Sequence, residues 1–213
     1  MACAAAAMIV SLTGFSAAPT ATGSRWHIVQ VLTSCGEGAD AVTATGASDA
    51  WTEGSALLTG GECPAGPIFV QHWNGVLWTS VISPAPVPDQ IGFTGLISAS
   101  SASNAWVFPL VQGTTSDFDT SLNWNGHSWT TVQLPGHVNV LSAFTFSRTD
   151  AWIFGAGPQG NPYIARNDGV AWEPASLPAD PLGVGAASRT DIWAVGPTKK
   201  TEHQPASDRK SVV

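Results

Sequence analysis

The feature that most constrains this chain is a short string that recurs four times. Each copy has a small polar turn, then Asp or Asn, one further residue and a tryptophan. The copies TGASDAW, SSASNAW, FSRTDAW and ASRTDIW end at Trp51, Trp106, Trp152 and Trp193. Their tryptophans lie on average about 47 residues apart, which is a period typical of repeat arrays. The chain is therefore expected to be built from four similar units.

A second string follows the first in three of the units. The copies HWNGVLW, NWNGHSW and RNDGVAW end at Trp78, Trp129 and Trp172. Asn-Gly between apolar runs is a strong hairpin signal, because a two-residue type I′ turn needs positive φ at both central residues. Each of these strings therefore predicts a tight hairpin.

Each unit can be interpreted as four strands. In the first unit the strands are expected over 39–45, 50–56, 68–73 and 76–82. Apolar and small polar residues alternate in them, and the Asp of the first string is expected to accept hydrogen bonds from backbone N–H groups of its turn. Four antiparallel strands per repeat describe the blade of a β-propeller. The predicted fold class is an all-β propeller of about four such repeats.

The first copy of the second string also raises the question of a site, since it places His72 beside Trp73 and Trp78. In the other copies the histidine position is occupied by Asn123 and Arg166, while the turn persists. The imidazole is therefore not what the motif requires, and the string is interpreted as a hairpin rather than a site.

The fourth unit lacks the second string, and this leaves two possible endings. A degenerate copy, ATGSRW, ends at Trp26, so an N-terminal strand over 24–32 could complete the last blade and close a ring of four. The alternative is that the sequence is a fragment of a longer array. The sequence leaves both endings open.

The combination of SxTDxW with a later WNGxxW resembles the tryptophan-repeat propellers of secreted bacterial proteins. Such repeats are often labelled galactose-oxidase-like or kelch-like, and the RNDGVAW copy partly echoes the sialidase repeat box. The resemblance covers residues 24 to about 197 and implies a propeller fold. It implies no particular activity, because function depends on the sites that a fold carries.

The chain is divided into a signal-like segment (1–22), the repeats (23–200) and a polar tail (201–213). The apolar stretch over 4–15 is too short for a membrane span of about 20 residues and resembles an atypical signal peptide without its basic start. We therefore expect an extracellular or cell-envelope protein without a transmembrane span. In an exported chain, Cys35 and Cys63 are expected to form a disulfide. The net charge of −7 argues against a nucleic-acid partner.

An up-and-down meander places the turns of both strings on one face and the longer loops on the opposite face. We call these the short-turn face and the long-loop face. The long loops are expected over 52–66, 83–90, 113–120 and 155–161. Recognition commonly uses variable loops on a rigid scaffold. The candidate residues on the long-loop face are Glu53, Glu62, Asp117 and Asp119.

Enzyme motifs find little support in the sequence. The five histidines show no zinc-ligand spacing, and HExxH, CxxC and GxSxG are absent, so no metal or cofactor is expected. The arginines form no recognisable carboxylate-binding cluster, and Tyr163 is the sole tyrosine. The sequence thus favours a non-enzymatic module that binds carbohydrate or a cell-surface protein. A glycan-acting hydrolase or lyase using the four candidate acids, and a structural or non-functional repeat fragment, are the alternatives.

Overall fold

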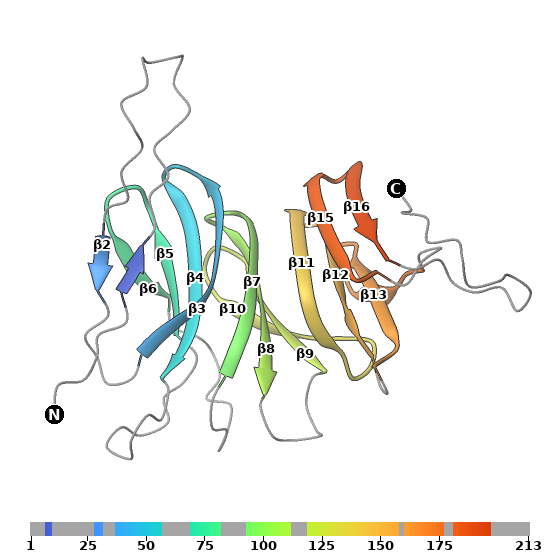
Figure 1. Cartoon of the computed structure of the whole chain (residues 1–213). Helices are drawn as coiled ribbons and strands as arrows, with labels where there is room; N and C mark the ends of the chain where they lie inside the picture. The colour runs from blue at the N-terminus through green and yellow to red at the C-terminus, as the bar shows by residue number, and fades with distance from the viewer. Residues whose placement is uncertain are drawn as a thin grey trace, which may run out of the picture. The chain divides into compact units, whose positions relative to one another are not determined.

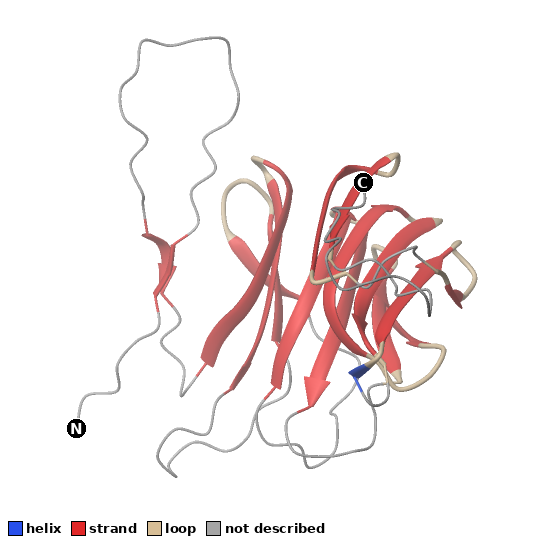
Figure 2. Cartoon of the chain, turned by 45° about the vertical axis from the view of Figure 1, so that its right-hand side comes forward, coloured by secondary structure: helices blue, strands red, loops and turns tan. Residues whose placement is uncertain are grey.

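The computed structural model describes most of the repeat region. The described residues are 7–9, 28–31, 37–56, 69–81, 93–111, 119–157, 160–176 and 181–196. Nearly all of them form strands or short turns (Figure 2), and none of their helical segments is long and apolar enough to cross a membrane. The chain divides into two compact units, which are Met1–Thr115 with Ser121–Thr131, and Ser116–Thr120 with Val132–Val213.

The first two repeats each form a four-stranded antiparallel sheet with its strands in chain order (Figure 1). The first sheet contains β3 (Glu37–Gly46), β4 (Asp49–Ala56), β5 (Phe69–Trp73) and β6 (Trp78–Val81). The second contains β7 (Phe93–Ser101), β8 (Asn104–Val111), β9 (Thr120–Trp124) and β10 (Trp129–Gln133). Each sheet is therefore a meander of the kind that forms a propeller blade.

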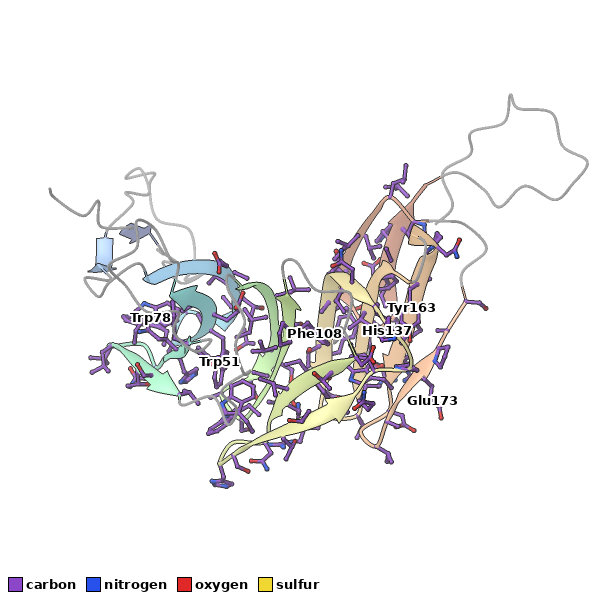
Figure 3. All side chains as sticks on the ribbon, turned by 90° about the horizontal axis from the view of Figure 1, so that it is seen from below. Trp51, Trp78, Phe108, His137, Tyr163 and Glu173 are labelled. Carbon is purple, nitrogen blue, oxygen red and sulfur yellow. The ribbon has the colours of Figure 1, made fainter. Side chains whose placement is uncertain are left out.

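Tryptophans fill the space between these two blades. Strand β7 packs against β3 and β4, and the Trp51 side chain is fully buried (Figure 3). Its ring centroid lies 6.3 Å from that of Trp124 and 6.4 Å from that of Trp129, both in edge-on arrangements. The motif tryptophan of the first blade therefore packs against the second blade.

The second unit contains the third sheet and a smaller fourth one. The third sheet contains β11 (Asn139–Ser147), β12 (Asp150–Ala156), β13 (Pro162–Asn167) and β14 (Trp172–Pro174), again in chain order. Strands β15 (Gly183–Ser188) and β16 (Asp191–Val195) pair with each other, and β15 lies beside β11. The core of the third sheet includes Ile153, Phe154 and Ile164, which are buried.

The predicted all-β propeller class is confirmed, because three of the repeats form four-stranded antiparallel sheets of the propeller-blade type. The N-terminal strand β2 (Ile28–Val31) pairs with β1 (Ala7–Ile9). Among the described residues the fourth repeat has two strands.

The hairpins of the second string have longer loops than the sequence predicted. Trp73 pairs directly with Trp78, which leaves the four residues 74–77 in the loop instead of two. Asn74 Oδ1 accepts hydrogen bonds from the backbone N–H groups of Val76 and Leu77, each at 3.0 Å. Gly75 supplies the positive φ, at 92°. The Asn side chain therefore organises a four-residue loop, and the prediction of a two-residue type I′ turn was wrong.

Candidate functional site

Serine closes the turn of the first string. The Oγ atoms of Ser101, Ser147 and Ser188 each accept a hydrogen bond from the backbone N–H two residues later, at 3.2–3.3 Å. The prediction gave this acceptor role to the Asp at the end of the turn. In the first three repeats that residue instead bonds the third strand of its own blade, and this includes the first repeat, which has Gly46 at the serine position.

The Asp or Asn of the first string joins the first and second hairpins of each four-stranded blade. In β4, β8 and β12 the motif tryptophan lies opposite a third-strand residue that bonds this Asp or Asn. We call these contacts the cross-strand polar pairs. They are His72 Nε2 with Asp49 Oδ1 at 2.7 Å, Asn123 Nδ2 with Asn104 Oδ1 at 3.4 Å, and Arg166 Nε with Asp150 Oδ1 at 2.9 Å.

In the third cross-strand polar pair the indole of the motif tryptophan also hydrogen-bonds the acid, whereas in the first pair the Trp51 ring lies against His72, with centroids 4.4 Å apart. Trp152 Nε1 donates to Asp150 Oδ1 at 3.2 Å, and the guanidinium carbon of Arg166 lies 5.6 Å from the Trp152 ring centroid. Asp150 is buried, while about half of the Arg166 side chain is exposed. The carboxylate and the indole therefore hold the guanidinium at the surface in a fixed position.

A cleft of about 350 Å³ opens beside this cluster. Its lining residues are Ser147, Thr149, Asp150, Trp152, Arg166, Arg189 and Thr190. They come from the SRTD turns of the third and fourth repeats and from β12 and β13. The turn at Gly169 packs against Thr149, so the cleft lies on the short-turn face. We refer to it as the arginine cleft.

Sequence reasoning did not find the arginine cleft. Arg166 and Arg189 are 23 positions apart in different repeats, and only the fold brings them to one cleft. A signal was nevertheless present in the aligned repeats. Arg189 stands where the first two repeats have Ala47 and Ala102, so the arginine is not needed for the turn itself.

The structure places the predicted residue Glu53 inside β4, three residues before that strand ends. The expected loop therefore begins later than the sequence predicted. The Glu53 side chain is fully buried, and its carboxylate lies against the backbone of Gly95. Burial, and next the charge of Asp40, raise the pKa of Glu53 to about 8, whereas the Gly95 backbone N–H acts in the opposite direction. A carboxyl group covered in this way is not accessible to a ligand on the long-loop face.

Asp119 lies in the turn just before β9 and is partly exposed. Its Oδ1 atom is 2.7 Å from His137 Nδ1, and its backbone carbonyl accepts from the N–H of Leu134. Nearby, the Tyr163 hydroxyl donates to the Pro135 carbonyl at 3.0 Å, and Figure 3 shows where Tyr163 and His137 lie. Asp119 therefore contributes to the contacts around the 134–138 turn.

The other predicted residues lie outside the described part of the chain. They are Glu62, Asp117 and the proposed disulfide partners Cys35 and Cys63. Their placement on the long-loop face stays a prediction, as does the disulfide. Among the described residues, no group of three or more His, Cys, Asp or Glu side chains is arranged to hold a metal ion.

The fold and the repeats define a class, that of all-β chains built from propeller-type blades. Comparisons with known proteins place the chain in no particular family, since no protein-family model and no curated protein matches it. A solved structure described as "YCF48 bound to D1 peptide" is similar, with a TM-score of 0.43 and 13% sequence identity. The similarity covers 76% of this chain and 49% of that one, so the chain spans about half the length of that structure.

Proposed function

We propose that this chain is an exported, non-enzymatic binding module that recognises a protein or a carbohydrate. The observation that supports the proposal is the arginine cleft, whose lining comes from the turns of two successive repeats. A rigid scaffold that presents turn residues around a cleft is a common basis for recognition.

The chemistry of the cleft favours binding over catalysis. Asp150 is the one carboxylate among the lining residues, and its Oδ1 atom already accepts from Arg166 and Trp152. A general base must lie within reach of the substrate proton, whereas Asp150 is buried. The lining side chains include no histidine or cysteine to take that role.

Export belongs to the same proposal. It rests on the signal-like segment 1–22 and on the resemblance to secreted tryptophan-repeat propellers. Expression in a bacterial host with and without these residues, followed by fractionation, tests it. Only the full chain is expected to be exported. Equal retention of both forms in the cytoplasm would contradict the proposed export.

The binding function is tested by applying the labelled full-length chain to arrays of glycans and of peptides. Specific binding on one of the two arrays is expected. A variant lacking residues 57–66 tests the long-loop face, and Arg189→Ala tests the arginine cleft. Absence of binding on both arrays would contradict the proposed function.

A further inference from the structure

We infer that the arginine cleft binds a carboxylate of an acidic peptide segment, either an Asp or Glu side chain or a C-terminal carboxyl group. The inference rests on the proposed binding function and names the ligand chemistry for one site of the module. Nothing in the sequence reasoning assigned a ligand to the short-turn face.

The unsatisfied hydrogen-bonding capacity of the cleft consists mainly of donors. Arg166 uses its Nε to bind Asp150, and its two terminal nitrogens have no acceptor among the described residues. Arg189 has no hydrogen bond or ion pair within the part of the chain that the structure describes. Guanidinium groups donate only, so the cleft suits a ligand that accepts hydrogen bonds.

The net charge of the cleft further favours an anionic ligand. The lining side chains carry two guanidinium groups and the single carboxylate of Asp150, which leaves a net positive charge. Arginine matches the planar geometry of a carboxylate with two parallel hydrogen bonds. The position of Arg166 is already set by Asp150 and Trp152, so this guanidinium loses little freedom when a ligand binds.

A peptide fits these groups better than a sugar does. Sugar recognition commonly combines an open aromatic face with acceptors for the hydroxyl protons. Here Arg166 lies over the Trp152 ring, and Asp150 Oδ1 already has two donors. The hydroxyls of Ser147 and Thr149 lie 3.4 Å apart and interact with each other. The cleft therefore offers little for a neutral sugar ring and much for a carboxylate.

Comparison of the repeats shows that the fold does not require the two arginines of the cleft. The first two repeats have the same turn and cross-strand polar pair, with Ala47 and Ala102 at the arginine position and His72 and Asn123 opposite the tryptophan. The blades thus form without these arginines. Arg166 and Arg189 are additions that meet at one cleft.

The experiment uses the full chain and end-blocked Gly-Ser decapeptides that carry either two central glutamates or two glutamines. Binding is followed by NMR titration of the arginine Nε–H resonances. The glutamate peptide is expected to bind at least tenfold more tightly than the glutamine peptide. The affinity for the glutamate peptide should fall as the salt concentration rises, because the contact is between exposed charges. The glutamine peptide with an unblocked C-terminus tests whether a C-terminal carboxyl group binds in place of an acidic side chain.

The variants provide a matched control. Arg148 occupies the same position of the SRTD turn as Arg189 but does not line the cleft. Arg189→Ala is expected to lower the affinity at least tenfold, and Arg148→Ala to change it less than twofold. Equal losses in the two variants, equal binding of both peptides, or preferential binding of an oligogalacturonate would overturn the inference. Binding to other array members that does not depend on Arg189 would contradict this inference but leave the proposed function standing.

Discussion

At the scale of single residues, Glu53 combines complete burial with an ionisable group. Neither of its carboxylate oxygens accepts a well-formed hydrogen bond among the described residues. Burying a charge without a partner is costly, and a carboxyl group in this position holds its proton instead. The pKa of about 8 expresses this preference for the neutral form.

The sign of the resulting pH dependence follows from the raised pKa. Between the unperturbed value of 4.5 and about 8, folded Glu53 keeps a proton that the unfolded chain releases. The free energy of unfolding therefore falls as pH rises through this window, by up to about 1.4 kcal/mol per pH unit. Glu53→Gln imitates the neutral form and is expected to remove this slope, so that the variant becomes more stable than the wild type near pH 8.

Urea unfolding between pH 4.5 and 8.5 measures this effect. Glu53→Asp is the control, since it keeps a titrating carboxyl group and should keep a negative slope. Parallel stability profiles for the wild type and Glu53→Gln would show that the carboxyl group is hydrated or paired in solution.

At the scale of elements, glycine is required where two turns of one blade meet. Gly169 has a φ of 96°, and a Cβ atom there would lie 2.7 Å from Thr149 Cγ2 and 3.1 Å from Thr149 Cα. Gly136 has a similar φ of 105° with open space around it. An alanine at Gly136 would therefore test backbone strain alone, whereas an alanine at Gly169 would add steric overlap with Thr149.

Gly136→Ala is expected to cost about 1–2 kcal/mol, which is the cost of a left-handed conformation for a residue with a Cβ. Gly169→Ala should cost about 1–3 kcal/mol more, because the added methyl group overlaps the neighbouring turn. Urea unfolding of the two variants gives the difference. Equal losses would mean that the turns at Gly169 and Thr149 move apart readily.

Sequence reasoning reached the blades because their signals are local and repeated. Both strings mark hairpins, and the four copies of the first with the three copies of the second located most of the strands. The four-residue loop after Trp73 was missed because a side-chain hydrogen bond from Asn74, rather than a two-residue turn, sets its length. Arg166 and Arg189 were missed as a pair because they meet through tertiary structure.

At the scale of the whole molecule, burial of the motif tryptophan declines along the array. The Trp51 side chain is fully buried, and Trp106 is 4% exposed. Trp152 is half-buried, and Trp193 is 49% exposed. Trp51 is covered by aromatic side chains from the second hairpin of the next blade. Among the described residues, no hairpin of a further repeat covers Trp193 in this way. The same motif therefore contributes differently to stability at the two ends of the array.

Trp51→Ala is expected to destabilise its unit by about 3–5 kcal/mol, because it leaves a large cavity between two blades. Trp193→Ala should cost about 1 kcal/mol or less, since solvent already contacts half of the side chain. Amide hydrogen exchange in the two units, at increasing urea, separates the two effects. Protection in β4 should fall in the first variant, while protection in β16 should change little in the second. A loss for Trp193→Ala as large as that for Trp51→Ala would mean that β16 is covered in solution.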